Sequence, residues 1–138
     1  MERQIGRTGL NETLKNTGFI AIVDDDEPLR EALGSVLKAA GFSIDAFASG
    51  EDFLSFPRWR ETACLILDVR LPGMSGIELQ RRLLDAASSV PIIFMTAHGD
   101  ALLRNVAMKA GAAGFLNKPV RSEILLTEIK SAIKKDEV

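Results

Sequence analysis

The sequence is poor in reactive and aromatic residues: it holds one cysteine, one histidine, one tryptophan and no tyrosine among 138 residues. The lone thiol, Cys64, excludes an intrachain disulfide and a cysteine metal cluster. No apolar run approaches the roughly 18 residues of a membrane span, and residues 1–17 lack the apolar stretch of a signal peptide. We therefore expect a protein of the reducing cytoplasmic compartment with no membrane partner.

The charge is nearly balanced, with 17 basic and 19 acidic residues and a net charge of −2. Without an excess of positive charge, we expect no direct nucleic-acid binding by this chain alone. Hydrophobic residues make up 46% and charged residues 26%, which excludes a disordered tail, a collagen-like fibre and a coiled-coil rod. The length suits one domain, which we place at 18–135, after a flexible N-terminal extension over 1–17.

Five short apolar segments predict β-strands, at 19–23, 43–47, 63–67, 91–95 and 113–116. The first, third and fourth are continuous apolar runs, typical of parallel strands covered on both faces. The segment at 43–47 alternates apolar and polar residues, which favours a place at the edge of the sheet.

Helical patterns separate these strands. The apolar residues within 29–40 recur at the spacing of one helix face, and Ser75 with Glu78 forms a capping-box pattern. Asp26 and Asp100 are predicted N-caps of the helices that follow them. Strict alternation of strand and helix predicts an α/β fold: a doubly wound, five-stranded parallel sheet of order 2-1-3-4-5 with five helices.

Polar side chains stand where the predicted strands end: Asp24 and Asp25 after the first, Asp68 after the third, Thr96 after the fourth and Lys118 after the fifth. In doubly wound folds the site lies at the carboxyl ends of the strands, so we expect these groups to meet. Clustered carboxylates repel one another, and their hard oxygens suit Mg²⁺. A carboxylate can accept a phosphoryl group, whose charge an ammonium and a hydroxyl can stabilise.

Four segments at these positions resemble the receiver domain of two-component response regulators: 23–28 (VDDDEP), 68–76 (DVRLPGMSG), 95–98 (MTAH) and 115–119 (FLNKP). The resemblance covers about 18–135 and is strongest to receivers of regulators with a C-terminal helix-turn-helix domain. It implies a chemotaxis-receiver-like, flavodoxin-like fold. It also implies a phosphoacceptor switch that assists its own phosphorylation and dephosphorylation, and not a conventional turnover enzyme.

The resemblance implies that Asp68 is the phosphoacceptor. Mg²⁺ would be held by Asp24, Asp25, Asp68 and the backbone carbonyl of Arg70. Arg70 and His98 occupy positions that in this family tune the lifetime of the acyl phosphate.

The phosphoryl group itself would be bound by Thr96, Ala97 and Lys118. Thr96 and Phe115 would form the switch, the hydroxyl moving toward the phosphoryl oxygens while the aromatic ring swings inward. Pro119 would follow a cis peptide bond.

The resemblance also implies partners. A sensor histidine kinase would donate the phosphoryl group, and phosphorylation would alter the face made by the fourth helix, the fifth strand and the fifth helix, which could also form a homodimer. DNA would be reached only through an effector domain outside this chain.

Two alternatives rest on the same strand ends. A haloacid-dehalogenase-type phosphatase would use Asp24 as nucleophile and Asp26 as acid, although Pro28 stands where such enzymes usually have Thr or Val. A flavodoxin-like cofactor binder would share the strand order, but the chain lacks a phosphate loop rich in Ser, Thr and Gly after the first strand.

Overall fold

The computed structural model of the chain describes residues 18–97 and 99–137. The predicted extension at 1–17 and His98 therefore lie outside the described residues. Among the described helices, none combines the length and hydropathy that a membrane crossing requires. The elements alternate along the chain in the order β1(Phe19–Val23), α2(Glu27–Ala39), β2(Ile44–Phe47), α3(Gly50–Ser55), η2(Trp59–Glu61), β3(Thr62–Asp68), α4(Gly76–Asp85), β4(Ile92–Thr96), α5(Ala101–Lys109), β5(Gly114–Asn117) and α6(Ser122–Glu137).

The sheet has the strand order β2-β1-β3-β4-β5, and every neighbouring pair is parallel. This confirms the order predicted from the apolar runs. Every residue of β1, β3 and β4 is buried, whereas the alternating segment β2 is only partly buried and lies at the edge.

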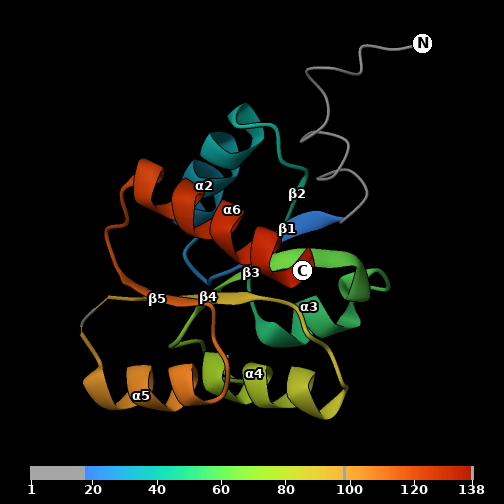
Figure 1. Cartoon of the computed structure of the whole chain (residues 1–138), viewed down its shortest axis with the longest axis vertical. Helices are drawn as coiled ribbons and strands as arrows, with labels where there is room; N and C mark the ends of the chain where they lie inside the picture. Colours follow the sequence, from blue (N-terminus) through green and yellow to red (C-terminus); the bar gives the residue numbers. More distant parts are fainter. Residues whose placement is uncertain (1–17, 98, 138) are drawn as a thin grey trace.

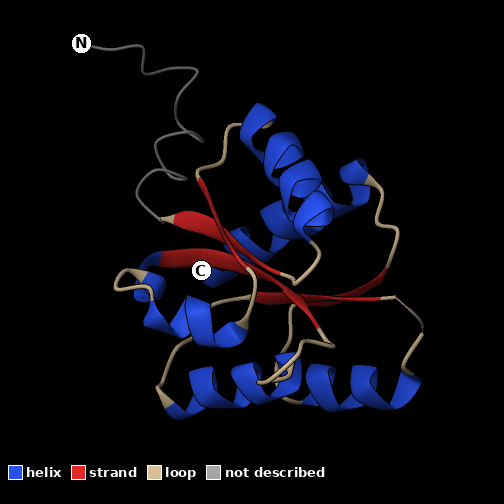
Figure 2. Cartoon of the chain, turned by 180° about the vertical axis from the view of Figure 1, so that it is seen from behind, coloured by secondary structure: helices blue, strands red, loops and turns tan. Residues whose placement is uncertain are grey.

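Helices cover both faces of the sheet, with α2 and α6 on one side and α3, α4 and α5 on the other (Figures 1 and 2). Successive side chains of a strand point to opposite faces. Ala21 and Val23 accordingly pack in the core under α3, α4 and α5, while Ile20 and Ile22 pack in the core under α2 and α6. The sheet is thus a rigid, doubly covered platform for the loops at its carboxyl edge.

Some strand limits differ from the predicted ones. β3 extends through Asp68 and β4 through Thr96, because ladder pairing continues to the ends, with Asp68 opposite Met95 and Thr96 opposite Asn117. Both polar residues are therefore held by the sheet itself and not by a loop.

The predicted helix caps are only partly confirmed. The Asp26 carboxylate accepts a hydrogen bond from the Leu29 amide at 3.2 Å, and the Ser75 hydroxyl accepts one from the Glu78 amide at 3.1 Å. Asp100 occupies the N-cap position of α5, but its side chain makes no capping hydrogen bond. The predicted position is therefore confirmed, but the carboxylate accepts hydrogen bonds from the side chains of Thr96 and Arg70 and not from the backbone of the helix.

Candidate functional site

Three carboxylates gather at the carboxyl edge of the sheet. Asp24 directly follows β1 and Asp68 ends β3, and these strands are neighbours. One carboxylate oxygen from each of Asp24, Asp25 and Asp68 lies within 4.8 Å of the other two. Asp24 and Asp68 are buried, whereas Asp25 is exposed, so the cluster opens to solvent on one side.

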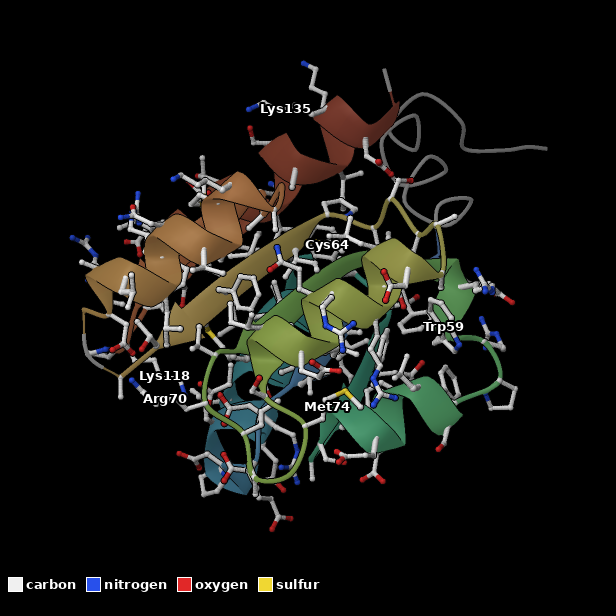
Figure 3. The ribbon with its side chains drawn as sticks, turned by 90° about the horizontal axis from the view of Figure 1, so that it is seen from below. Trp59, Cys64, Arg70, Met74, Lys118 and Lys135 are labelled. Atoms are coloured by element: carbon white, nitrogen blue, oxygen red, sulfur yellow. The ribbon has the colours of Figure 1, made fainter. Side chains whose placement is uncertain are left out.

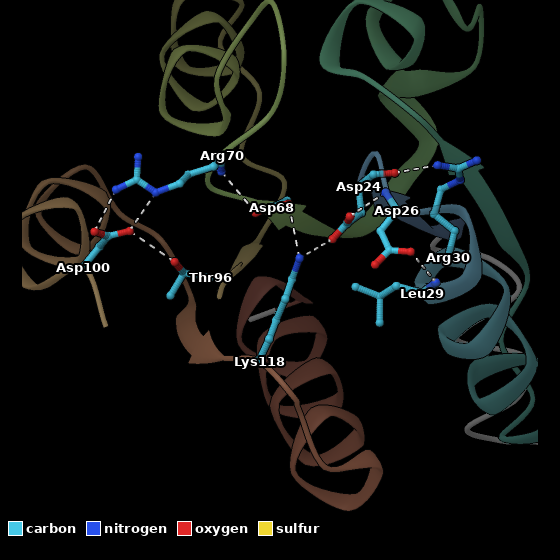
Figure 4. Close-up of polar contacts among 9 residues, drawn as sticks. All are labelled: Asp24, Asp26, Leu29, Arg30, Asp68, Arg70, Thr96, Asp100 and Lys118. Atoms are coloured by element: carbon cyan, nitrogen blue, oxygen red, sulfur yellow. Dashed lines mark hydrogen bonds and ion pairs between the residues drawn. The ribbon is translucent and has the colours of Figure 1, made fainter. Parts of the chain in front are cut away.

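A single ammonium group joins the two buried carboxylates. The Lys118 Nζ atom donates to Asp24 Oδ2 at 2.8 Å and to Asp68 Oδ2 at 3.2 Å (Figure 4). The Lys118 backbone amide donates to the Thr96 carbonyl at 2.7 Å, which ties the end of β5 to that of β4. The peptide bond between Lys118 and Pro119 is cis. Figure 3 shows Lys118 and Arg70 at the same end of the molecule.

The surroundings of the cluster raise the pKa values of both Asp68 and Lys118. Burial raises the pKa of the Asp68 carboxyl and the Asp24 carboxylate raises it further, against the opposing effects of the Arg70 amide and Lys118. Burial alone would lower the pKa of Lys118, but its hydrogen bonds and ion pairs with Asp24 and Asp68 outweigh this and hold that pKa above its ordinary value. Lys118 therefore stays protonated. The three carboxylates around it carry more negative charge than this one ammonium neutralises.

Backbone groups fix the orientation of both buried carboxylates. The Asp26 amide donates to Asp24 Oδ1 at 3.0 Å, and the Arg70 amide donates to Asp68 Oδ1 at 3.1 Å. Each carboxylate therefore has one oxygen on the backbone and one on Lys118. This arrangement leaves the side chains little rotational freedom before any ligand binds.

Two residues that support the cluster were missed in the sequence. A Cβ atom at Gly76 would lie 2.4 Å from the Asp68 carbonyl oxygen, so only glycine allows the start of α4 to approach Asp68 so closely. The sequence signal that could have identified Gly76 is its place at the end of the segment 68–76. The Arg30 guanidinium donates to the Asp24 carbonyl at 2.8 Å, and no sequence pattern pointed to this contact.

Thr96 belongs to a second polar group beside the cluster. Its hydroxyl donates to Asp100 Oδ2 at 3.2 Å. The Arg70 side chain donates to the same carboxylate twice, from Nε to Oδ2 at 3.2 Å and from Nη2 to Oδ1 at 2.8 Å (Figure 4). Asp100 therefore bridges Thr96 and Arg70. The sequence predicted Asp100 only as a helix cap and did not indicate this bridge.

Two further predicted residues lie at the end of β4 and in β5. Ala97 directly follows Thr96 and is exposed. Phe115 is buried, its ring centroid 5.9 Å from that of Phe94, so the ring already faces the core. The Phe115 carbonyl accepts a hydrogen bond from Arg104 at 3.0 Å, which connects β5 to α5.

The acidic cluster has the chemistry of a site for a hard cation. Its donors are carboxylate oxygens, and more negative charge converges there than Lys118 neutralises. Mg²⁺ prefers such oxygens and is often bound by one or two carboxylates together with water and phosphate. The residues present therefore fit Mg²⁺.

Comparisons with known proteins agree with this geometry. Residues 20–130 match the family model described as the response regulator receiver domain. The chain is 42% identical over 128 residues to the response regulator protein TodT of Pseudomonas putida, covering 93% of this chain and 56% of TodT. It is 41% identical over 120 residues to the transcriptional regulatory protein FixJ of Bradyrhizobium diazoefficiens, covering 87% of this chain and 58% of FixJ.

Solved structures give the same result. The crystal structure of FixJ-N superposes with a TM-score of 0.78 at 40% identity, over 85% of this chain and 94% of that one. The chain spans 56% of the length of TodT and 58% of the length of FixJ.

Proposed function

Because the chain belongs to the response regulator receiver domains of two-component signal transduction, we propose that Asp68 is its phosphoacceptor and that a sensor histidine kinase is the donor. The observation that carries this proposal is the Lys118 ammonium held between Asp68 and Asp24 at 3.2 and 2.8 Å. A cation that already contacts the acceptor carboxylate is placed to receive the charge of an incoming phosphoryl group.

The proposed reaction transfers a phosphoryl group onto Asp68. A carboxylate oxygen of Asp68 forms a bond to phosphorus while the phosphorus–nitrogen bond of the kinase phosphohistidine breaks, and the electron pair stays on the imidazole nitrogen. Asp24, Asp25, Asp68 and the Arg70 carbonyl would hold Mg²⁺, which would screen the carboxylates from the incoming phosphate. The Arg70 amide on Asp68 Oδ1 keeps that carboxylate in place.

Three groups would bind the transferred phosphoryl oxygens: the Thr96 hydroxyl, the Ala97 amide and the Lys118 ammonium. Thr96 ends a buried strand and Ala97 follows it at the surface. The predicted inward swing of Phe115 would need little movement, because its ring is already buried against Phe94 before Thr96 turns toward the phosphoryl group. The switch thus connects Asp68 to β5 and to the helices that flank it.

The output surface would be the face made by α5, β5 and α6, which could also form a homodimer. Leu102 and Val106 of α5 and Ile124 of α6 are exposed large hydrophobic side chains. A change in the position of α5 would alter how these side chains are presented to a partner.

The alternative of an Asp24-based phosphatase is not supported. Asp24 is fully buried, whereas the Asp68 side chain is 9% exposed, so a phosphoryl donor has access to Asp68 and not to Asp24. Asp26, the acid of that mechanism, caps α2 instead. The family match likewise points to a regulatory switch.

The receiver unit would comprise 18–135, with 1–17 as a separate extension. FixJ is named a transcriptional regulatory protein, and we propose that the phosphorylation state of this receiver controls transcription through parts of a longer regulator. This chain itself would make no nucleic-acid contact, consistent with its net charge of −2.

Intact mass spectrometry after incubation with acetyl phosphate tests the proposal. The wild type should gain one phosphoryl group, about 80 Da, with Mg²⁺ but not with EDTA, and the adduct should be labile to hydroxylamine. Asp68→Asn should gain none, whereas Asp85→Asn, which alters an exposed acid on α4, should behave as the wild type. An adduct that persists in Asp68→Asn, or none in the wild type, would contradict the proposal.

A further inference from the structure

The Thr96 hydroxyl already has a partner in this structure, and that partner is not Asp68. Thr96 is 1% exposed, so water offers its hydroxyl little alternative. Its hydroxyl donates to Asp100 Oδ2 at 3.2 Å. A hydroxyl has one proton and donates to one acceptor at a time.

Asp100 is itself held in place by Arg70. Two guanidinium nitrogens of Arg70 bind the two Asp100 oxygens, at 3.2 and 2.8 Å, which is the bidentate arrangement that fixes the plane of a carboxylate. The Arg70 amide meanwhile donates to Asp68 Oδ1. Arg70 therefore connects the acceptor carboxylate, through its backbone, to the carboxylate that holds Thr96, through its side chain.

We propose that Asp100 is a positioning residue that holds the Thr96 hydroxyl away from the acceptor site until Asp68 carries a phosphoryl group. The inference rests on the proposed function, in which Thr96 binds a phosphoryl oxygen. Because the single hydroxyl proton cannot serve both acceptors, Asp100 and the phosphoryl group compete for Thr96. Asp100 thereby favours the unphosphorylated conformation.

The position of Asp100 gives this competition a structural consequence. Asp100 is the N-cap residue of α5, which begins at Ala101, and its side chain makes no capping hydrogen bond there. When Thr96 leaves, the carboxylate loses one of the contacts that tie the start of α5 to the site. The signal would then pass from Asp68 through Thr96 to α5 as one exchange of hydrogen bonds.

The metal-free protein provides the first test. Three-bond NMR couplings to the Thr96 methyl group report the χ1 rotamer of that side chain. The wild type should show one dominant rotamer, and Asp100→Ala should show averaged couplings because the hydroxyl has lost its acceptor. Unchanged couplings in Asp100→Ala would overturn the proposal, with no dependence on phosphorylation.

Affinity for beryllofluoride, measured with Mg²⁺ present, provides the second test. Asp100→Ala should bind it about tenfold more tightly, the lower end of the effect of a hydrogen bond to an ionised group. In a Thr96→Ala background the same substitution should change the affinity less than twofold. A tenfold gain that persists without the hydroxyl would show that Asp100 acts only by its charge, and would overturn the proposal.

Further variants keep the outcomes distinct. Asp100→Asn retains an acceptor oxygen and should give a smaller gain in affinity than Asp100→Ala; it also replaces that variant if the alanine protein does not fold. Wild-type protein that binds no beryllofluoride would contradict the proposed function. The Thr96 couplings would still decide whether Asp100 holds the hydroxyl.

Discussion

Replacing the Asp68 carboxylate should make the metal-free protein more stable. Asp68→Asn removes one of three mutually close negative charges and keeps a side chain of nearly the same shape. The amide oxygen can still accept a hydrogen bond from the Arg70 backbone, as the carboxylate does at 3.1 Å. The substitution therefore tests electrostatics with little change in packing.

The size of the effect follows from the distances in the site. Carboxylate oxygens of Asp24 and Asp25 lie within 4.8 Å of one on Asp68, and at an effective dielectric constant near 20 each such repulsion costs about 3.5 kcal/mol. Attraction to Lys118 Nζ, 3.2 Å from Asp68, contributes about 5 kcal/mol in the other direction. Because Asp25 is exposed and screened by water, we expect a net stabilisation of about 1–2 kcal/mol.

Urea unfolding in EDTA measures this difference in the free energy of unfolding. The exposed control Asp85→Asn should change it by less than about 0.5 kcal/mol. Adding Mg²⁺ should stabilise the wild type and not Asp68→Asn, because a ligand that binds the folded state raises its stability. An Asp68→Asn protein no more stable than the wild type in EDTA would refute the electrostatic reasoning.

Three further predictions concern the carboxylate, its loop and the core. In the metal-free protein the pKa of Asp68 should exceed its ordinary value and rise further in Lys118→Ala, as followed by ¹³C NMR. Because the pKa of Asp68 is higher in the folded state than in the unfolded state, its contribution to the free energy of unfolding should fall with rising pH. The fall should begin near the unfolded-state pKa, about 3.9, and end above the folded-state value. Gly76→Ala places a Cβ atom 2.4 Å from the Asp68 carbonyl and should lose about 1–3 kcal/mol in urea unfolding and slow the phosphorylation by acetyl phosphate; Gly99→Ala, where nothing lies within 4 Å, is the control, and an equal loss in both would contradict the steric argument. Phe53→Ala, at a fully buried position, should lose about 3–5 kcal/mol in urea unfolding, and a loss below about 1 kcal/mol would contradict its place in the core.

The sheet could be predicted because its signal is local. Continuous apolar runs such as 19–23 and 63–67 are typical of strands that are covered on both faces, and these strands are fully buried. Alternation at 43–47 likewise marked the edge. The meeting of Asp24 and Asp68 then followed from parallel geometry, since carboxyl ends of neighbouring strands share one edge.

The supporting contacts could not be predicted, because they depend on tertiary geometry that no local pattern encodes. Asp100 had the sequence signature of a helix cap and does occupy the cap position, but its carboxylate binds Arg70, 30 residues away in the chain. The bond from Arg30 to the Asp24 carbonyl depends on how α2 leaves the sheet. Sequence patterns located the helices that carry Arg30 and Asp100 but did not indicate which residues their side chains contact.

A structure of the protein with Mg²⁺ and beryllofluoride would show directly whether Asp68 is the phosphoacceptor. We expect beryllium to be bonded to an Asp68 carboxylate oxygen and Lys118 to contact a fluorine. The Thr96 hydroxyl should have left Asp100 for another fluorine. Beryllofluoride on Asp24, or on no carboxylate at all, would contradict the assignment of Asp68 as phosphoacceptor.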